Sequence, residues 1–428
     1  MGLFGRSKDS GAGARSTQAS SSTPSGSRSE QRGQRQPPQQ RQSQQQTRGY
    51  GPPAPPPPFP PPPPPQGPSR VRPAAAQPAV RPPGSIGVGI ETEFLLDARR
   101  AGPDENQSLR LFARALCKKY NALVSAEHPR MFSLVQNYFE GPTHLHWCMT
   151  QDPTVETARE PWGIEMASPI LLAYPGSPWR QDVEATWQFL RENYAITSDE
   201  NCSTHVHMSL TDGYTVPQLK RLAQAIIHFE PAIEALVPPA RRGNEYARSN
   251  WIDNENFAYR KLSREQSMAV IERCQDTDEL IGLMNPKQSR YFGWNFLALK
   301  KYKTVEFRRG ACSRSVNDVF MWVEFAISFL QASMRVRSLE DYKTYPPSVG
   351  GLSMFVHSAN LPSEPGMHVT SHLDRLFAGR RPNDRVEPVP VGRLSAEKQK
   401  KLAMKIKADS QSNPMLAKIY YAQNSGVI

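Results

Sequence analysis

The sequence predicts an α+β fold in which a largely antiparallel, curved sheet is flanked by helices. Short segments with strand-like alternation are interspersed with long helical patterns, without the regular strand–helix spacing of a parallel sheet. Residues 291–299 and 303–310 are close enough in sequence to pair as antiparallel neighbours. A similar succession of short strands is predicted at residues 143–152 and 162–172.

The other elements follow from hydrophobic periodicity and from residues that begin or end helices. Alternation predicts two more strands, over residues 86–96 and 203–211. Helical spacing predicts the helices, over residues 108–123, 179–194, 216–237, 263–274, 316–336 and, in a charged peripheral segment, 395–423. Ser177 is the expected N-cap of the second helix, with Pro178 in its first turn, and Ser315 is the expected cap of a long buried helix. Pro231 is expected to break the third helix.

The chain divides by composition into a tail and a folded part. Residues 1–83 are dominated by Ser, Gln, Arg, Gly and Pro and include the run "GPPAPPPPFPPPPPP". Because almost nothing apolar is available for burial, this tail is predicted to be disordered, with the proline run in polyproline II conformation. Residues 84–340 have the composition of a globular domain, and residues 341–428 are expected to form a C-terminal extension of helices and loops.

The basic charge is concentrated in the tail. The formal net charge is +12, of which residues 1–83 contribute +9 and the rest of the chain only +3. The folded part is therefore close to neutral, and no nucleic-acid partner is expected. The proline run offers a ligand to an SH3 or WW-type partner, although a plain spacer is the commoner use of such a segment.

Cysteine usage and hydropathy indicate the compartment. Five widely spaced cysteines without a Cys-x-x-Cys pair fit a reducing environment, and neither a disulfide framework nor a thiolate zinc site. No signal-peptide pattern opens the sequence, and the longest apolar run, "FMWVEFAISFL", is too short for a membrane span and contains Glu324. A soluble protein of the cytoplasm or nucleus is therefore expected.

Four predicted strands carry ionisable side chains on one face. Side chains two apart on a strand point to the same side. This spacing pairs Glu91 with Glu93, His205 with His207, and Glu306 with Arg308, while Glu165 stands alone in "GIEMAS". Charges at such positions are costly unless they are paired or bound to a ligand. Carboxylates suit magnesium or manganese, and imidazole and guanidinium groups suit phosphate.

Each of these patterns also has an ordinary structural explanation. A Glu-x-Glu pair is usually the solvated face of a sheet, a single His-x-His pair is more often packing or surface, and Glu-x-Arg is often an ion pair. The second His-x-His pair of the chain, His144 and His146, is interpreted in this way. The four strands together are harder to explain as packing, which favours a site.

In order along the chain, the motifs resemble those of the amidoligase family, which is related to glutamine synthetase and γ-glutamylcysteine synthetase. The resemblance rests on "GVGIETEF", "GIEMASPIL", "STHVHMSL" and "TVEFRRG". It is supported by "WCMTQDPTV", the loop "FEPAIEALVPPARRGNEYARSN" and the hairpin "SRYFGWNFLALKKYKTVEFR". It covers roughly residues 86–335 and implies a glutamine-synthetase-like catalytic fold.

The resemblance implies a role for each motif residue. The implied metal ligands are Glu91, Glu93, Glu165, His205 and Glu306. His207 is placed near the nucleotide, and Arg308 is placed on the transferred phosphoryl group. Either Arg241 or Arg242 contacts the nucleotide or substrate, and Asp152 faces the substrate or a metal. The chain departs from the family in "CST" at residues 202–204 and in a second arginine at residue 309.

The implied activity is ATP-dependent formation of an amide or isopeptide bond between a carboxylate and an amine of small molecules or peptides. Phosphorylation of the carboxylate gives an acyl phosphate that an amine can attack, a step that needs Mg²⁺ or Mn²⁺ and cationic side chains. Clustered Glu and His supply the ion sites, and Arg308 and Arg241 or Arg242 supply the positive charge. Glu306 and Glu165 are both candidates for the general base.

The sequence leaves three alternatives to this hypothesis of a ligase. A metal-dependent amide hydrolase would use the His-x-His pair and an activated water, but it requires further ligands on successive parallel strands that the spacing does not provide. Cys202 as a nucleophile near His205 lacks an oxyanion-stabilising element. An inert domain with a partner-binding tail is the third alternative, and the presence of every expected metal residue favours an active enzyme instead.

Overall fold

The sheet is built from strands that the computed structural model bounds as β1 (Ile86–Ala98), β2 (Met131–Ser133), β3 (Trp147–Thr150), β4 (Trp162–Ala167), β5 (Leu171–Ala173), β6 (Tyr194–Thr197), β7 (Ser203–Leu210), β8 (Trp294–Asn295) and β9 (Val305–Ala311). Their order is β2-β3-β4-β1-β7-β9-β8, and β5 and β6 pair with β1 outside this path. These pairings are antiparallel except that of β2 with β3. The structure describes residues 81–100, 102, 107–135, 143–359 and 371–411. Within them, an α+β fold with a mostly antiparallel, open sheet is confirmed.

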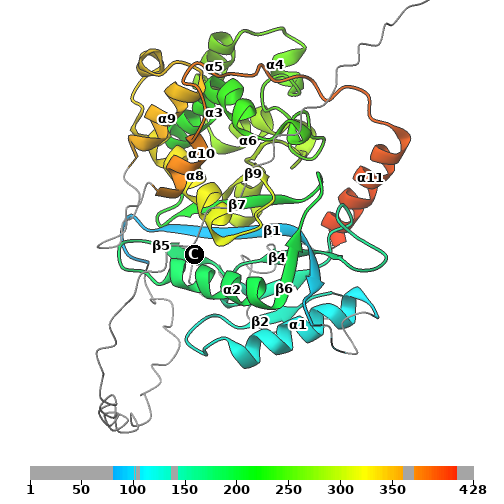
Figure 1. Cartoon of the computed structure of the whole chain (residues 1–428). Coiled ribbons are helices and arrows are strands. Elements are labelled where there is room, and N and C mark those ends of the chain that lie inside the picture. The colour runs from blue at the N-terminus through cyan, green and yellow to red at the C-terminus, as the bar shows by residue number, and fades with distance from the viewer. Residues whose placement is uncertain (1–80, 101, 103–106, 136–142, 360–370, 412–428) are drawn as a thin grey trace, which may run out of the picture. The chain divides into compact units, whose positions relative to one another are not determined.

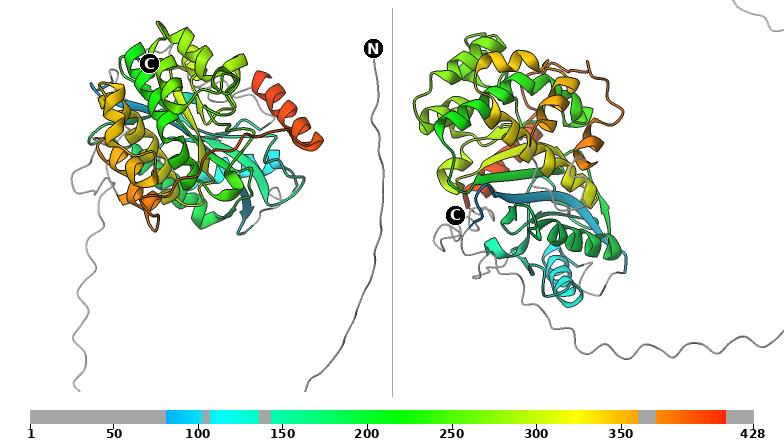
Figure 2. Two further views of the ribbon diagram at one scale, coloured as in Figure 1. Left: turned by 90° about the horizontal axis from the view of Figure 1, so that it is seen from above. Right: turned by 90° about the vertical axis from the view of Figure 1, so that its left-hand side faces the viewer.

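Most of the helices lie on two opposite sides of the sheet, and α11 lies beside it (Figure 1). The helices are α1 (Leu109–Leu123), α2 (Trp179–Asn193), α3 (Val216–Leu236), α4 (Glu255–Ala258), α5 (Arg264–Glu272), α6 (Thr277–Met284), α7 (Ala298–Tyr302), α8 (Val316–Arg335), α9 (Val349–His357), α10 (Ser371–Phe377) and α11 (Ala396–Gln411). Figure 1 shows α3, α8 and α9 toward the β9 end of the sheet and α1 and α2 toward the β4 end. The side view in Figure 2 shows the same arrangement.

The apolar face of the sheet is covered by α2 and α8. Phe94 on β1 meets Trp187 of α2 edge-on at a ring distance of 5.9 Å, and Phe307 on β9 lies 5.4 Å from Phe325 of α8. Burying a side chain of this size contributes about 1.5–3 kcal/mol. Because side chains alternate along a strand, this packing turns the neighbouring Glu93 and Glu306 to the opposite face.

Two expectations about helices are wrong. Ser177 does not cap α2, which begins after Pro178 without a side-chain cap; the Ser177 hydroxyl accepts instead from the Tyr174 amide (3.4 Å). The third predicted helix does not break at Pro231, because α3 runs through it without interruption. The missing N–H costs one helical hydrogen bond, which burial of the surrounding turns offsets, and the Pro231 carbonyl accepts from Val386 N (2.9 Å).

The expected hairpin before the last strand is confirmed in pairing but not in length. Trp294 lies opposite Phe307 and Asn295 opposite Glu306 in antiparallel register. Only these two residues of the predicted segment 291–299 are strand, because the chain then turns into α7.

Arg81 belongs to the folded unit, although the predicted tail of residues 1–83 includes it. Its guanidinium donates to Ser209 Oγ (3.1 Å) and to the Leu210 carbonyl (3.4 Å). Gly87 leaves the space for it, since a Cβ there would collide with the guanidinium. The boundary of the folded part therefore falls before residue 81. Residues 1–80, which carry the proline run and the expected SH3 or WW ligand, lie outside the described residues.

Glu324, inside the longest apolar run, is buried on α8 and contacts residues of α2 and α10. Its carboxylate accepts from Arg180 of α2 (2.8 Å) and from the Leu373 amide of α10 (3.2 Å), and it lies 3.0 Å from His372 Nδ1. These partners compensate the charge of a carboxylate that would otherwise be costly in the core. None of the helices in the described ranges combines the length and the apolar character that crossing a bilayer would need.

A second buried ion pair joins β9 to α3. Arg309 donates to Glu234 Oε2 (2.6 Å) and to Glu230 Oε1 (3.0 Å). Gly293 makes room for it, because a Cβ there would lie 2.6 Å from Arg309 Nε. The second arginine that departs from the family pattern is thus a structural link on the pleat face opposite Arg308.

This link predicts a pH-dependent stability. Burial raises the pKa of Glu230 to about 7, against the lowering effect of Arg309. Between the ordinary glutamate pKa and about 7 the folded chain keeps a proton that the unfolded chain loses, so stability falls as pH rises through this window, by about 3 kcal/mol. Glu230→Gln should remove this slope in urea titrations between pH 4.5 and 8. A slope equal to that of the parent chain would show that Glu230 does not hold the proton.

Candidate functional site

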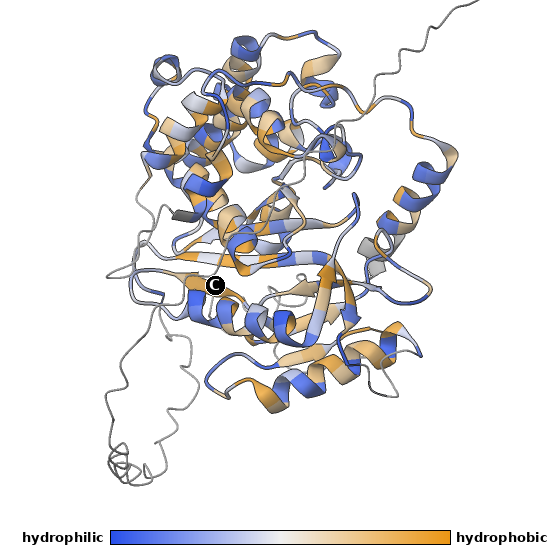
Figure 3. Ribbon diagram, viewed as in Figure 1, coloured by the Kyte–Doolittle hydropathy of each residue, from blue (hydrophilic) through white to orange (hydrophobic). Residues whose placement is uncertain are grey.

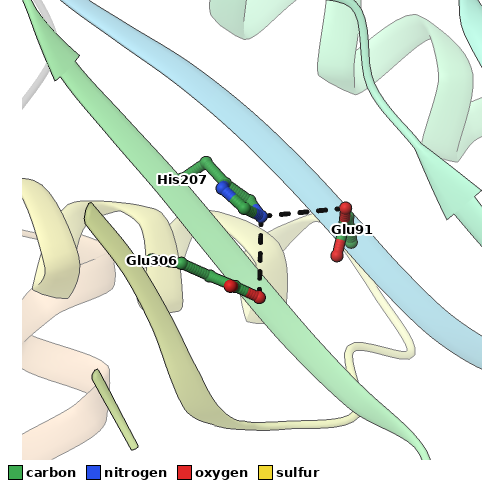
Figure 4. A group of neighbouring side chains, drawn as sticks. All are labelled: Glu91, His207 and Glu306. Atoms are coloured by element: carbon green, nitrogen blue, oxygen red, sulfur yellow. Dashed lines mark ion pairs between the residues drawn. The ribbon is translucent and has the colours of Figure 1, made fainter. Parts of the chain in front are cut away.

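Three adjacent strands bring a histidine between two carboxylates. β7 lies between β1 and β9, and the register places His207 opposite Glu306. Nε2 of His207 lies 3.7 Å from Glu91 Oε1 and 3.6 Å from Glu306 Oε1. Figure 4 shows the three side chains pointing toward one another, and all three are buried. The alternation of β-strands, with Val206 and Phe307 in the core, is what turns them to this face.

His205 lies beside the same carboxylates and is oriented by Ser203. Its Nδ1 is 3.4 Å from Glu91 Oε2 and 3.9 Å from Glu306 Oε1. Ser203 donates to Glu93 Oε2 (2.6 Å), so its oxygen is left to accept from His205 Nε2 (2.8 Å). Nε2 therefore carries a hydrogen, and Nδ1 faces the carboxylates.

A second acidic cluster lies further along the same face. Ligand atoms of Glu93, Asp152 and Glu165 all lie within 4.8 Å of one another, and Glu93 is opposite Glu165 in the β1–β4 register. Asp152 Oδ1 accepts from the amide and hydroxyl of Thr154 (2.8 and 2.7 Å). Asp152 Oδ2 pairs with the ammonium group of Lys405 on α11.

The surroundings keep the first two carboxylates ionised. Burial alone would raise the pKa of Glu91, but the hydrogen bond with His205 and the charges of His207 and His205 hold it well below its ordinary value. Burial also opposes ionisation of Glu306, yet the charges of Arg308 and His207 lower its pKa to about 2. Both groups are therefore negative at neutral pH, as ligands of a divalent cation must be.

These residues fit a divalent cation. The two carboxylates and the imidazole of the first cluster offer ligand atoms within 4.8 Å of one another. Among the described residues, the buried Nε2 of His207 has no hydrogen-bond partner, while its Nδ1 lies 3.2 Å from the Thr304 hydroxyl. A buried polar atom without a partner is costly, and a cation would satisfy it.

Arg241 and Arg242 are adjacent in the loop after α3 but contact different parts of the structure. Arg241 lines a pocket together with Glu93, His205 and Arg308, and it donates to the Glu200 carbonyl (3.0 Å). Arg242 turns away and donates to the Glu234 carbonyl near the C-terminal end of α3 (3.0 Å). Of these two arginines, only Arg241 lines this pocket.

Arg308 is held on the site face by its neighbours. It donates to Glu306 and to the Tyr246 carbonyl (3.3 Å), and its side chain is buried. The other oxygen of Glu306 accepts from Asn295 (2.7 Å), which comes from the β8 side of the hairpin. Both the carboxylate and the guanidinium are thus fixed before any ligand arrives.

A model of the family described as "Putative amidoligase enzyme" matches residues 85–330. The chain belongs to this amidoligase family. No curated protein matches the sequence significantly.

Among solved structures, the amidoligase is similar to a bifunctional glutathione synthetase from Pasteurella multocida. The two share 12% identity over 81% of this chain and 51% of that chain, with a TM-score of 0.27. The amidoligase thus spans about half the length of that protein, and similarity at this level supports no inference about fold or activity.

The residues that the sequence predicted for the amidoligase site come together on one face of the sheet. The first cluster gathers Glu91, His207 and Glu306 with His205 alongside, and the second gathers Glu93 and Glu165 with Asp152. The second His-x-His pair lies outside both clusters, where His146 packs edge-on against Phe132 at 4.9 Å. The thiol of Cys202 has a raised pKa, through a hydrogen bond with Cys312 and burial, which makes it a poor nucleophile.

Four residues that contact the site residues were not predicted from the sequence to have a role there. They are Ser203, Thr304, Asn295 and Lys405. Ser203 shares the period of the two histidines, which was a usable signal. Asn295 and Lys405 had none, because their contacts depend on where a hairpin and a distant helix lie in space.

Proposed function

We propose that this amidoligase is an ATP- and Mg²⁺- or Mn²⁺-dependent carboxylate–amine ligase that forms an amide or isopeptide bond through an acyl phosphate. We further propose that its catalytic domain is glutamine-synthetase-like. The observation that supports this function most is the convergence of ionised carboxylates, imidazoles and two arginines on one buried sheet face. Transfer of a phosphoryl group to a carboxylate depends on such charge compensation.

In this proposal the first cluster holds the metal ion. Glu91, His207 and Glu306 would bind it, and His205 would support it through its Nδ1. A bound divalent ion would neutralise phosphate charge. Arg308 and Arg241 stand at the pocket and would orient the phosphoryl group and the carboxylate substrate. Because Arg308 is already fixed by Glu306 and the Tyr246 carbonyl, little reorganisation is needed on binding.

A cavity near the far end of β7 has room for a nucleotide. Its volume is about 690 Å³, and its lining includes Leu210, Tyr214, Lys300 and Lys303. Cavities that bind small molecules usually measure roughly 300–1,000 Å³. Lys303 in its lining precedes Thr304, whose hydroxyl contacts His207, so one chain segment contributes both to this cavity and to the surroundings of the first cluster.

The proposal is tested by incubating the full chain with ATP, Mg²⁺ and a panel of amino acids and peptides. ADP and phosphate should appear together with a product whose mass equals the two substrates minus water. ATP binding should be measured separately by calorimetry with and without Mg²⁺. No product across the panel, combined with no nucleotide binding, would rule the ligase function out.

Deletion of residues 1–80 should leave ligase turnover unchanged. Every predicted site residue lies in the described part beyond residue 80, and the shortened chain keeps Arg81 with its contacts to Ser209 and Leu210. Turnover of both chains should be compared at equal concentration. A severalfold loss would place part of the tail in the site.

A further inference from the structure

Helix α11 docks onto the site through one lysine. Of its residues 396–406, only Lys405 is buried, with 6% of its surface exposed. The neighbouring Met404 and Ile406 are 48% and 51% exposed. Figure 3 shows α11 as hydrophilic along most of its length, with hydrophobic residues in between. A helix that docks by the hydrophobic effect would bury its apolar side chains and leave lysines in water, which is the reverse of this arrangement.

The carboxylate of Asp152 compensates the buried ammonium group. Removing a lysine ammonium from water costs several kcal/mol unless it is paired with an opposite charge. Lys405 Nζ pairs with Asp152 Oδ2, and Glu93 and Glu165 offer further carboxylate oxygens within 4.8 Å of Asp152. The second cluster therefore supplies what a primary ammonium group needs: excess negative charge and acceptors only.

Two contacts on the N-terminal side of Lys405 hold α11 near the second cluster. Val391 N donates to Asp253 Oδ1 (2.9 Å), and Lys398 Nζ pairs with Glu245 Oε2 (3.1 Å). Lys398 is mostly exposed, so its ion pair contributes little. The helix is thus held close to the site while its own attachment depends mainly on Lys405, an arrangement that allows exchange with a competing ligand.

Lys405 also lines the pocket beside Arg241 and Arg308. The cavity that it lines with Glu93 and these arginines has a free volume of only about 10 Å³, which is room for about one water molecule. A substrate side chain that binds beside the arginines would therefore need lining residues such as Lys405 to move.

We propose that the cluster of Glu93, Asp152 and Glu165 is the amine subsite of the ligase, that it takes a lysine side chain, and that Lys405 is its intramolecular occupant. The amine substrate is then the ε-amine of a lysine in a peptide or protein, and the bond formed is an isopeptide bond. This inference rests on the proposed function. It assigns the second cluster to an ammonium group and not to a metal.

The geometry suits the reaction. The ammonium group passes one proton to the Asp152 carboxylate, and the free amine attacks the acyl carbon. A carbon–nitrogen bond forms, the bond from that carbon to the phosphate oxygen breaks with its electron pair going to phosphate, and the second proton of the nitrogen passes to the leaving phosphate, which gives a neutral amide. Arg241 and Arg308, which line the same pocket, stand where the leaving phosphate is negative.

Binding of a lysine side chain can be measured without ATP, so the result does not depend on ligase activity. The probe is Nα-acetyl-lysine methylamide, its norleucine counterpart is the control ligand, and calorimetry is the readout. Lys405→Ala should bind the lysine probe at least tenfold more tightly than the parent chain or Lys400→Ala, an exposed lysine of the same helix. Adding Asp152→Asn should abolish this gain, with circular dichroism to confirm folding.

A second measurement uses the unmodified chain. An amine-acetylating reagent followed by mass spectrometry should label Lys405 at least tenfold more slowly than Lys400, and saturating lysine probe should speed the labelling of Lys405. Equal affinity of the probe for all three chains, or equal labelling of the two lysines, would overturn the subsite. Tight Mn²⁺ binding that appears in Lys405→Ala and is lost with Asp152→Asn would overturn it in favour of a metal.

Discussion

His207→Ala is expected to abolish metal-dependent ATP binding and ligase turnover. Nε2 of His207 lies between Glu91 and Glu306 and has no hydrogen-bond partner among the described residues, so its removal takes away a proposed ligand. Loss of an outer-shell partner already weakens metal sites about 10- to 100-fold, and a direct ligand should cost at least that. Mn²⁺ binding followed by electron paramagnetic resonance gives the affinity, and ADP release gives turnover.

The matched control is His146→Ala, which changes the same residue type in the other His-x-His pair. His146 packs on Phe132 away from both clusters, so Mn²⁺ affinity should stay within about twofold of the parent chain. Unfolding temperatures of both variants separate a lost ligand from a lost fold. If His207→Ala keeps full Mn²⁺ affinity while His205→Ala loses it, the ion is held by the other imidazole.

Arg309→Met is expected to lower the free energy of unfolding by about 3–5 kcal/mol, because it leaves the buried carboxylate of Glu234 without its cation. Urea titration at pH 6 measures the loss. Arg309→Met combined with Glu234→Gln should recover most of it at this pH, where burial keeps the remaining Glu230 largely protonated.

Arg314→Met serves as the comparison for this loss. Arg314 is exposed just beyond β9, so its replacement should change stability by less than about 0.5 kcal/mol. A loss for Arg309→Met as small as that for Arg314→Met would mean that water reaches the pair in solution.

The pairing of Lys405 with Asp152 is expected to affect assays of the parent chain. Because this lysine occupies the acidic cluster beside the pocket, free amines compete with a tethered lysine whose local concentration is high. Weak turnover with small amines and stronger turnover with lysine-containing peptides is the pattern that the amine subsite predicts.

Local alternation was enough to predict the site residues on three of the strands. In β1, β7 and β9, residues two apart share a face, so "ETE", "HVH" and "EFR" identified which side chains leave the core before any contact was known. Serine at an N-cap works in the same local way: Ser315 begins α8 as expected, since its hydroxyl accepts from the Asp318 amide. The failure at Ser177 shows the limit, because a nearby turn uses that hydroxyl instead.

The antiparallel α+β class and the polar face of each strand follow from spacing over a few residues, and the family follows from the resemblance of the ordered motifs. Three other features are visible only in three dimensions: Arg241 and not Arg242 reaches the pocket, α3 continues through Pro231, and Lys405 meets Asp152. These outcomes depend on the path of loops and on packing between segments far apart in the chain. The free energy of such contacts leaves no periodic trace in the sequence.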